Sequence, residues 1–423
     1  MNFKEQPLSN ILEINPRMVL KKGTITKKIA MEHLNENIKR IKGYELAEFK
    51  SGSKFKNQDT LVARITPCLE NGKTAFVNIL DENEVAFGST EFFVVRAKEG
   101  KGDPQFIYYL MRHPEVREAA IKSMTGTSGR QRAQKEAILD YSMSLPNIIE
   151  QKKIGYILSL FDSKIEENND IIRNLEQFSQ TLFKHWFIDF EFPNEEGQPY
   201  KSSGGKMVES ELGEIPKDWV ICKAGNILEF SPIEKIAKNK TATFVEMKNL
   251  NTSAMVYDYI QKPFKSGSKF RNGDTLLARI TPCLENGKIG FVDFLNENEV
   301  GWGSTEFITI RTKNNIASSF SYYFASEQNF KNYAIKNMNG SSGRQRVKAE
   351  TLINYLIAIP PNELIKKFTD ISEPNMQMMT KLKEETLILR KVRDTLLPKL
   401  LSGEIEIPDE LRCNQCLNTM NQN

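Results

Sequence analysis

The sequence ARITPCLENGK occupies residues 63–73, and the same letters return at residues 278–288. The repeat extends on both sides, because residues 51–76 and 266–291 differ at only a few positions. The differing pairs are Lys56/Arg271, Gln58/Gly273, Val62/Leu277, Thr74/Ile289 and Ala75/Gly290. The long spacing between the copies indicates a duplicated domain, because the repeats of solenoid proteins recur about every 20–50 residues.

Two shorter motifs accompany each copy. GSTEF stands at residues 88–92 and again at 303–307, and MTGTSGRQR at residues 124–132 matches MNGSSGRQR at residues 338–346. Outside these blocks the two halves diverge freely, for instance across residues 1–50 and 216–265. The duplication has therefore kept three short segments and changed most of what surrounds them.

The bulk composition is that of a folded, water-soluble protein. The chain has 423 residues, enough for two or three domains, with 39% hydrophobic and 26% charged residues. No run of about eighteen apolar residues is present, and the first residues, MNFKEQPLSN, lack the apolar core of a signal peptide. We therefore expect a cytoplasmic protein without a membrane partner. The net charge of +4 neither requires nor opposes a nucleic-acid partner, because the placement of charge matters more.

The cysteines predict reduced thiols rather than a disulfide framework. Their number, five, is odd and low for a chain of this length. Cys68 and Cys283 hold matching places inside the repeat. Cys413 and Cys416 form a single CNQC pair, which is a weak signal for zinc without a second pair.

The motifs of common enzymes are absent from the sequence. His33, His113 and His185 are scattered and form no cluster for zinc or for a catalytic triad. SSGGKM at residues 202–207 lacks the final hydroxyl of a phosphate-binding loop, and no Gly-rich dinucleotide motif follows a strand. Neither the Asn/Asp-Pro-Pro-aromatic motif of amino-methyltransferases nor a cluster of nuclease carboxylates occurs. We expect a chain that is not an enzyme and that binds no metal or cofactor itself.

Each half is predicted to form a mixed α/β domain. DTLVARI and FFVVRA in the first half, and DTLLARI and FITIRT in the second, are predicted strands because they are rich in β-branched and aromatic residues. Residues 102–124 are predicted to form helices between the strands and the SGRQR segment. The expected fold class is α+β, with two similar domains separated by long helices.

A long helix is predicted after each domain, because apolar residues recur there with the 4-3 spacing of a coiled coil. The first seam comprises Ile154, Leu158, Phe161, Ile165, Asn168, Ile172, Leu175, Ser179, Leu182 and Trp186. The second seam comprises Leu364, Phe368, Ile371, Asn375, Met378, Leu382, Glu385, Leu389, Val392 and Leu396. A helix lying along a globular core is the alternative to a coiled coil. We expect Pro374 to break or restart the second helix, because proline lacks the amide that a helix interior needs.

The composition also predicts the boundaries of the parts. Residues between the halves are rich in Gly, Ser, Pro and charge, which indicates a linker with no other role. In chain order we expect a domain, a long helix, a linker, a second domain, a second long helix and a tail, at residues 1–149, 150–190, 191–212, 213–361, 362–403 and 404–423.

An antiparallel pair of the long helices is the simplest assembly, because a short linker then suffices before the second domain. This arrangement relates the two domains by a pseudo-two-fold axis, like a symmetric dimer fused into one chain. Duplex DNA is an extended, two-fold partner that such a molecule would fit. Four apolar residues off the seams either dock partner subunits or widen the contact between the helices; they are Phe178, Phe183, Leu387 and Leu397.

The repeated segments carry side chains suited to DNA recognition. Arginine donates two hydrogen bonds to guanine, asparagine pairs with adenine, and glutamate accepts from cytosine. A glycine beside two arginines suits a loop that contacts phosphates and probes a base edge. The candidate DNA-binding residues are Arg64, Thr66, Glu70, Asn71, Lys73, Ser89, Thr90, Gly129, Arg130, Gln131 and Arg132, with Arg279, Thr281, Glu285, Asn286, Lys288, Ser304, Thr305, Gly343, Arg344, Gln345 and Arg346 in the second half.

Structural roles stay open for part of this set. Asn71 and Gly72 also fit a plain hairpin turn, and Glu70 also fits a surface carboxylate. Thr66 and Cys68 are expected to pack rather than to contact bases. The SGRQR segments are more easily explained by phosphates than by folding, because each places two arginines in a loop.

In this order the motifs resemble the specificity subunits of type I restriction–modification systems. The resemblance is carried by DTLVARITPCLENGK and DTLLARITPCLENGK, each followed by its GSTEF, its SGRQR and a long helix. The first helix ends in QTLFKHWFIDF, the second ends in LLPKLLSGEI, and GEIPKDW at residues 213–219 opens the second domain. The resemblance covers essentially the whole chain. It implies two target-recognition domains, each recognising one half of a split double-stranded DNA target.

The resemblance also implies partners. It implies two methyltransferase subunits docked on the coiled coil that sets the gap, and restriction subunits when DNA is cut. S-adenosylmethionine, ATP and magnesium would be used by those partners, and this chain carries no motif for them. Because the repeated segments are nearly identical, we predict similar half-sites and a nearly palindromic target. Gln58/Gly273, Thr74/Ile289 and the divergent start of each half are the differences that would make the half-sites unlike.

A stand-alone DNA-binding regulator, built as a pseudo-dimer in one chain, is the alternative function. A methyltransferase gene beside this one would favour the restriction–modification complex over the regulator. A purely structural coiled-coil scaffold would leave the repeated Arg, Asn and Glu residues unexplained.

Overall fold

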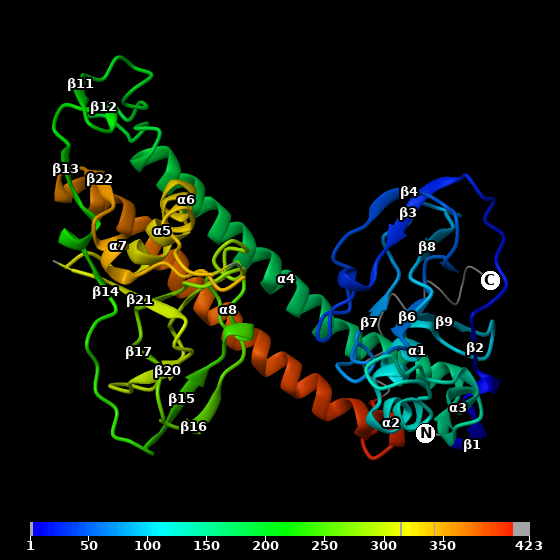
Figure 1. Cartoon of the computed structure of the whole chain (residues 1–423). Coiled ribbons are helices and arrows are strands. Elements are labelled where there is room, and N and C mark those ends of the chain that lie inside the picture. The colour runs from blue at the N-terminus through cyan, green and yellow to red at the C-terminus, as the bar shows by residue number, and fades with distance from the viewer. Residues whose placement is uncertain (1–2, 314, 342, 409–423) are drawn as a thin grey trace. The chain divides into compact units, whose positions relative to one another are not determined.

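A computed structural model describes residues 3–313, 315–341 and 343–408. Cys413 and Cys416, the pair considered for zinc, lie outside the described residues. The chain divides into two compact units (Figure 1). Unit 1 comprises Met1–Glu167 and Thr386–Asn423, and unit 2 comprises Asn168–Glu385, so each of the two long helices contributes to both units.

Unit 1 is built on two four-stranded sheets. Its strands are β1 (Phe3–Pro7), β2 (Leu12–Ile14), β3 (Ile25–Ile29), β4 (Glu45–Glu48), β5 (Ser53–Phe55), β6 (Thr60–Ala63), β7 (Thr74–Phe76), β8 (Ala86–Gly88), β9 (Phe92–Ala97) and β10 (Ser142–Pro146). One sheet has the order β2-β9-β6-β7 and is antiparallel; the other has the order β4-β3-β8-β5, with β3 and β8 parallel. β1 and β10 form a separate antiparallel pair.

Short helices connect strands of unit 1 along the chain. They are η1 (Leu8–Asn10), η2 (Met31–His33), α1 (Pro104–Arg112), α2 (Pro114–Lys122) and α3 (Lys135–Leu139). The carboxylate of Asp103 caps α1 by accepting a hydrogen bond from the Phe106 amide at 2.9 Å, and a proline opens the helix. α1 packs on β6, β7 and β9. The predicted strands and helices of this half are therefore present, and they bracket the repeated segments.

Unit 2 repeats this design. Its strands are β11 (Met207–Ser210), β12 (Gly213–Pro216), β13 (Val220–Lys223), β14 (Leu228–Phe230), β15 (Thr241–Val245), β16 (Ile260–Pro263), β17 (Ser268–Phe270), β18 (Thr275–Ala278), β19 (Ile289–Phe291), β20 (Gly301–Gly303), β21 (Phe307–Thr312) and β22 (Leu356–Ile359). Its short helices are η3 (Ala224–Asn226), η4 (Met247–Asn249), α5 (Ser319–Ser326), α6 (Gln328–Lys336) and α7 (Ala349–Ile353). The sheets β14-β21-β18-β19 and β16-β15-β20-β17 match those of unit 1 strand for strand.

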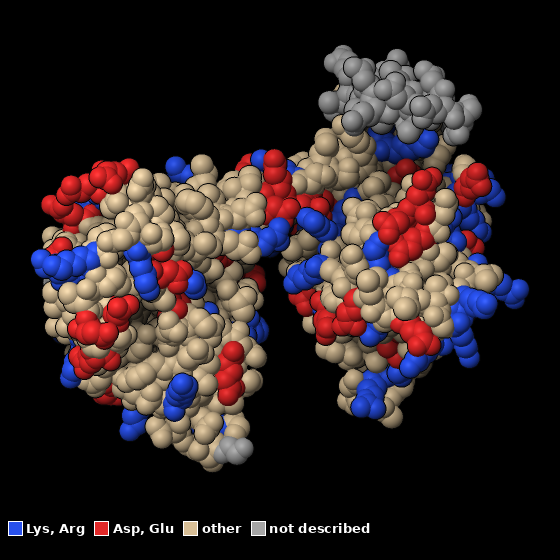
Figure 2. Space-filling model, turned by 90° about the horizontal axis from the view of Figure 1, so that it is seen from above, with Lys and Arg blue, Asp and Glu red and all other residues tan. Residues whose placement is uncertain are grey.

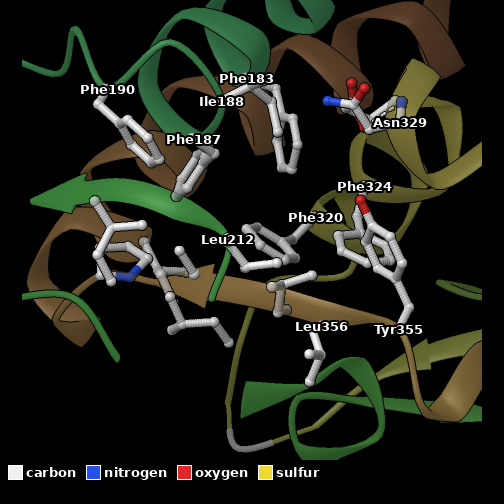
Figure 3. Close-up of a pocket in the computed structure, with 17 residues that line it drawn as sticks. Phe183, Phe187, Ile188, Phe190, Leu212, Phe320, Phe324, Asn329, Tyr355 and Leu356 are labelled. Atoms are coloured by element: carbon white, nitrogen blue, oxygen red, sulfur yellow. Dashed lines mark hydrogen bonds between the residues drawn. The ribbon is translucent and has the colours of Figure 1, made fainter. Parts of the chain in front are cut away.

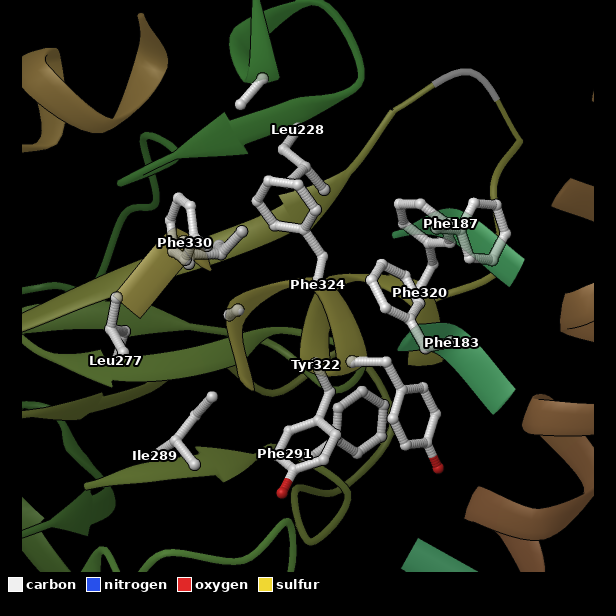
Figure 4. Close-up of a cluster of buried hydrophobic side chains, with 14 of the residues drawn as sticks. Phe183, Phe187, Leu228, Leu277, Ile289, Phe291, Phe320, Tyr322, Phe324 and Phe330 are labelled. Atoms are coloured by element: carbon white, nitrogen blue, oxygen red, sulfur yellow. The ribbon is translucent and has the colours of Figure 1, made fainter. Parts of the chain in front are cut away.

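The core of unit 2 is rich in aromatic rings, which Figure 4 shows between the sheet and the helices. The Phe183 and Phe320 rings meet edge to face with centroids 5.5 Å apart, and Phe187 contacts Phe320 at 5.6 Å. Such pairs add about 0.5–1.5 kcal/mol each beyond the area that they bury. They join the long helix before the second domain to α5, which packs on the sheet that carries the repeated segment.

The long helices are α4 (Ile148–Phe187) and α8 (Asn362–Ser402). Within unit 2 they run antiparallel, as the pairs of facing polar residues show. Asn168 Nδ2 donates to Glu385 Oε2 at 2.8 Å, and Asn375 Nδ2 donates to Ser179 Oγ at 3.0 Å. The predicted pair of long helices is therefore present.

The buried face of α8 lies one residue away from the predicted seam. Ile371, Met378 and Val392 are 37%, 50% and 38% exposed, so the prediction that these residues form the seam is wrong. Leu382, Leu389 and Leu396 are half-buried, and Phe368 is buried. The row that α8 buries comprises Ile365, Thr369, Ser372, Met376, Met379, Lys383, Thr386, Arg393, Leu397 and Leu400. It again has 4-3 spacing, with the half-buried Arg390 between Thr386 and Arg393.

The face of α4 follows the predicted pattern more closely. Seven of its seam positions are buried, namely Ile154, Leu158, Ile165, Asn168, Ile172, Ser179 and Trp186. Phe161, Leu175 and Leu182 are half-buried beside them. Of the apolar residues off the seams, Phe183 and Leu397 are buried, Leu387 is half-buried and Phe178 is 53% exposed.

Pro374 does not break α8, which is continuous from Asn362 to Ser402. The prediction of a break is wrong, because Pro374 lies on the exposed side of the helix. The carbonyl of Asp370, the acceptor that the missing amide would have reached, belongs to an exposed residue that water can satisfy.

The segment predicted as a linker with no other role, residues 191–212, contains folded structure. β11 and β12 form a hairpin there, and the Phe192 ring stacks on Tyr200 at 4.5 Å and on Trp219 at 5.5 Å. Glu191 also accepts a hydrogen bond from the Ser202 amide at 3.0 Å. The stacked aromatic residues hold this segment in place.

Candidate nucleic-acid interface

The first repeated segment leaves the sheet at the end of β6 and returns at β7. Between them, residues 64–73 form a compact turn that contains the cis peptide bond Thr66–Pro67. The amide of Asn71 donates to the carbonyl of Pro67 at 2.9 Å, and the amide of Lys73 donates to that of Cys68 at 3.0 Å. Unit 2 has the same turn, with a cis bond at Thr281–Pro282 and equivalent hydrogen bonds at 2.9 Å.

The SGRQR segment forms the tip of a small hairpin. The amide and carbonyl of Thr125 exchange hydrogen bonds with those of Arg132 at 3.1 and 2.9 Å. The Arg130 amide donates to the Thr127 carbonyl at 3.0 Å, and Gly129 between them has φ +79°, a conformation that favours glycine. Gly343 has the same φ in unit 2. The glycine of the motif is therefore needed by the turn that presents the arginine after it.

Backbone hydrogen bonds join all three repeated segments at one place. The Thr66 amide donates to the Gln131 carbonyl at 3.0 Å, and the Ala133 amide donates to the Arg64 carbonyl at 2.8 Å. The Arg64 amide in turn donates to the carbonyl of Glu91, in GSTEF, at 2.9 Å. In unit 2 the three equivalent bonds measure 3.0, 3.0 and 2.9 Å. We call the surface formed by residues 64–73, 88–92 and 125–132, and by their counterparts in unit 2, the shared site.

The two arginines of each hairpin are in different environments. Arg132 Nη2 and Nε donate to the Glu91 carboxylate at 2.8 and 3.0 Å, and this hydrogen bonding raises the pKa of Arg132. Arg346 and Glu306 form the same pair in unit 2. Arg130 is exposed, and its guanidinium has no hydrogen-bond or ion-pair partner among the residues that the structure describes.

Several candidates have structural partners in the shared site. Lys73 Nζ donates to the Met31 carbonyl at 3.2 Å, and Lys288 Nζ donates to the Met247 carbonyl at 3.1 Å. Ser89 Oγ accepts from the Glu91 amide at 3.1 Å. The corresponding contacts of unit 2 include Ser304 Oγ with the Glu306 amide at 3.1 Å and Thr281 Oγ1 with the Gln345 carbonyl at 3.4 Å.

The arginines at the start of the turn are half-buried rather than free. Arg64 lies over the ring of Phe93, with 5.2 Å between the guanidinium carbon and the ring centroid. Arg279 Nε is 3.9 Å from the Glu306 carboxylate. Thr66 contacts Met124 and is also half-buried, in keeping with the expectation that it packs. These half-buried residues pack beneath the exposed residues of the shared site.

The exposed candidates are those at the rims of the turn and the hairpin. They are Glu70, Asn71, Thr90, Gly129 and Arg130, with Glu285, Asn286, Thr305, Gly343 and Arg344 in unit 2. Asn71 takes part in the turn only through its backbone, so its amide side chain stays available. Gln131 and Gln345 are half-buried beside them. Each unit thus presents a carboxylate, an amide, a hydroxyl and a guanidinium on a rigid base, which are the groups that contact base edges and phosphates.

Charge alone does not mark this surface. Figure 2 shows Lys and Arg side chains interspersed with Asp and Glu on the visible face of each unit. Within the shared site itself, each Glu of GSTEF neutralises the second arginine of the hairpin. Recognition of DNA here would depend on placed side chains more than on a broad positive field.

Sequence patterns did not reveal the residues behind the shared site. The Met31 and Met247 carbonyls that hold Lys73 and Lys288 lie in the divergent part of each half. A Cβ atom at Gly72 would lie 2.6 Å from Arg117 Nη1, so α2 closes over the turn. The equivalence of Met31 and Met247 is not visible in the sequence, because they lie outside the repeated motifs. It becomes apparent only when the strands of the two units are matched.

An apolar pocket of about 290 Å³ in unit 2 lies apart from the repeated segments. Figure 3 shows that Phe183 and Phe187 of α4 and Phe320 and Phe324 of α5 surround it. Among the described residues, no group of three or more His, Cys, Asp or Glu side chains is placed to hold a metal ion. The helices described in the structure include none that is long and apolar enough to cross a membrane.

Comparisons with known proteins agree with the geometry. The sequence model of the family described as "Type I restriction modification DNA specificity domain" matches residues 2–177 and again residues 207–386. The chain is 24% identical over 319 residues to the type I restriction enzyme MjaIX specificity subunit of Methanocaldococcus jannaschii, covering 72% of this chain and 70% of that protein. It is also 24% identical over 430 residues to the HindI specificity subunit of Haemophilus influenzae, covering 87% and 90%.

A solved structure shares the fold. The type I restriction-modification system S subunit from M. genitalium superimposes with a TM-score of 0.52 at 15% sequence identity, covering 96% of this chain and 97% of that one. The family match covers both halves and includes every repeated segment. The chain therefore belongs to the type I restriction–modification DNA specificity family and is a non-catalytic DNA specificity subunit with two copies of the family's domain.

Proposed function

We propose that each unit recognises one half of a split DNA target through its shared site. The observation that carries this proposal is the recurrence of one constellation: the same three segments, joined by the same backbone hydrogen bonds, present the same exposed side chains in both units. Arg130 and Arg344 contact phosphate or guanine, and Asn71 and Asn286 contact base edges. Glu91 and Glu306 hold the hairpins in place by pairing with Arg132 and Arg346.

The half-sites are expected to be nearly inverted repeats of each other. The substitutions inside the repeat support this expectation, because they lie away from the exposed rim. Thr74 and Ile289 are buried at 3% and 1% exposure. Gln58 and Gly273 occupy the same left-handed turn, with φ 72° and 87°. Matching recognition surfaces in one chain suit a two-fold target, as in dimeric DNA-binding proteins.

The partners in this proposal are two methyltransferase subunits, with restriction subunits where the host encodes them. In this proposal, S-adenosylmethionine, ATP and magnesium are used by those subunits. Exposed apolar side chains on the long helices support docking of the methyltransferase subunits there. Phe178 is 53%, Leu160 is 50% and Ile388 is 63% exposed.

Mapping methylated bases in host DNA tests the proposal. Cells that express this chain with its methyltransferase subunit should carry one methylated motif, consisting of two short, nearly inverted half-sites separated by a fixed gap. Cells lacking this chain should lack that motif. Half-sites of unrelated sequence would contradict the expectation of a near palindrome, and a motif independent of this chain would contradict the proposed function itself.

A further inference from the structure

A short turn borders the shared site of each unit. In unit 1, η2 follows β3, and in unit 2, η4 follows β15. Lys73 Nζ donates to the carbonyl of Met31, the first residue of η2, at 3.2 Å. Lys288 Nζ donates to the carbonyl of Met247, the first residue of η4, at 3.1 Å. The repeated segment therefore anchors an equivalent turn in both halves, although the surrounding sequences differ.

The two turns have the same backbone conformation, but the residue at the middle of each carries the opposite charge. His33 Nδ1 and Asn249 Oδ1 each accept a hydrogen bond at 3.0 Å from the backbone amide three residues earlier, so the turns close in the same way. The residue between Met31 and His33 is Glu32, and its counterpart between Met247 and Asn249 is Lys248. Both are exposed.

Both charged groups are available to a partner. Glu32 has no side-chain partner among the described residues. Lys248 Nζ lies 2.7 Å from a Glu246 carboxylate oxygen, but its side chain is 78% exposed. An exposed ion pair of this kind is worth little in water and exchanges readily for another anion or acceptor.

The reversal contrasts with the other differences near the shared site. Thr74 and Ile289 are buried and cannot reach a base. Gln134 is replaced by Lys348 after the hairpin, which adds a positive charge without reversing one, and the Gln134 side chain donates to Thr125 Oγ1 at 2.9 Å. Glu32 and Lys248 thus form the exposed pair whose sign changes beside an otherwise repeated surface.

We propose that Glu32 and Lys248 determine specificity and make the two half-sites differ at one base pair. A carboxylate accepts a hydrogen bond from the amino group of cytosine, whereas an ammonium group donates to the acceptors of guanine. The base edge facing η2 then presents a donor, and the edge facing η4 presents an acceptor. This inference rests on the proposed function and gives the place where the target departs from a palindrome.

Exchanging the charges tests the proposal in the full chain expressed with its methyltransferase subunit. Glu32→Lys should change the methylated motif at one position of one half-site, so that it matches the corresponding position of the other half. Lys248→Glu should make the reciprocal change in the other half-site. The preference at that position should shift by about tenfold or more, as expected for one base contact.

Neutral variants and matched controls keep the result interpretable. Glu32→Gln and Lys248→Gln should relax the preference at the same positions. Glu48→Lys makes the first charge change on an exposed residue that pairs with Ile25, at the opposite end of β3 from η2, and should leave the motif unchanged. Lys240→Glu, just before β15, is the equivalent control in unit 2.

Three outcomes separate failure of this inference from failure of the proposed function. If the wild-type chain directs a split motif and the exchanged variants change one position, the inference is supported. If the wild-type motif is present but both exchanges and both neutral variants leave it unaltered, the inference is overturned and the proposed function stands. If the wild-type chain directs no motif, both are overturned.

Discussion

At the scale of single residues, the hairpin arginines divide two tasks. Arg132 pairs with Glu91 and ties the hairpin to the GSTEF segment, whereas Arg130 is exposed at its tip. The pair between Arg132 and Glu91 holds the hairpin in position. The neighbouring Arg130 is therefore exposed to solvent on a well-ordered hairpin. The same division in unit 2 makes Arg344 the matching exposed group.

Arg130→Ala and Arg344→Ala should each weaken DNA binding and flatten its salt dependence. The slope of log K against log salt should fall by about 0.9 for each phosphate that the variant no longer neutralises. Titrations of the full complex with a duplex carrying its target, at four or more salt concentrations, measure this slope. Arg130→Lys is the control, because it keeps the charge and should keep the slope. A slope unchanged in both alanine variants would remove the hairpin tips from the interface.

Lys39 is a buried cation whose environment predicts a pH effect. Its ammonium group lies about equally far from the rings of Phe76, Tyr108 and Tyr109, at 5.1, 5.0 and 4.8 Å from their centroids. Burial lowers the pKa of Lys39 from 10.5 to about 8, although the nearby Asp162 carboxylate opposes the shift. The side chain is therefore held by aromatic faces at an electrostatic cost.

The free energy of unfolding should rise with pH between about 8 and 10.5 because of Lys39. In that range the folded chain has released the Lys39 proton and the unfolded chain still holds it, so the unfolded state binds more protons. The gain should approach about 3 kcal/mol by pH 10.5. Chemical denaturation of the wild type and of Lys39→Met across this range measures the difference. Parallel curves for the two proteins would contradict the assigned pKa.

At the scale of elements, α8 shows why apolar spacing alone misplaces its buried face. The row that it buries contains Lys383, Thr386 and Arg393, which apolar spacing excludes from a core. Lys383 pairs with Asp293, and Arg393 pairs with Asp162 of α4, and each pair is almost fully buried. These partners are far away in the sequence, so apolar spacing favours the neighbouring row instead. α4 also buries polar residues, among them Asp162 and Glu176, but most of its predicted seam residues lie within its buried face.

Removing one member of the buried helix pair should be costly. Arg393→Met leaves the Asp162 carboxylate buried, accepting a hydrogen bond from Tyr109 Oη at 2.5 Å but without its guanidinium partner. The expected loss is about 3–5 kcal/mol in the free energy of unfolding, measured by urea denaturation. The double variant Asp162→Leu/Arg393→Met should recover part of this loss, because neither member of the pair is left buried without the other. Equal losses in the single and double variants would mean that the ion pair does not govern this contact.

In the shared site, too, contacts between residues far apart in the sequence could not be predicted from sequence patterns. The three segments that meet in the shared site could be identified from the sequence, because they are repeated in both halves while the residues around them differ. The separate roles of Arg130 and Arg132 were not apparent, since the Glu91 partner lies in another segment and the pairing depends on the fold. Lys73 is a predicted DNA-binding residue, and its Nζ donates to the Met31 carbonyl, a contact that no sequence motif indicates.

At the scale of the whole molecule, duplication gives two units that each carry a copy of the shared site. The turns that border the two copies differ in sequence. The strand orders of the sheets correspond in both units, and the hydrogen bonds that join the repeated segments agree within about 0.2 Å. The border turns carry Glu32 in one unit and Lys248 in the other. A specificity subunit built in this way would recognise a split target whose halves are related but distinguishable.

Footprinting on the mapped target tests most directly whether each unit recognises one half. The complex with the wild-type chain should protect the guanine N7 positions and backbone of both half-sites. With Arg130→Ala, protection should weaken in one half-site alone, and with Arg344→Ala it should weaken in the other alone. Loss of protection in the same half-site with both variants, or equal loss across both half-sites with either one, would contradict the account.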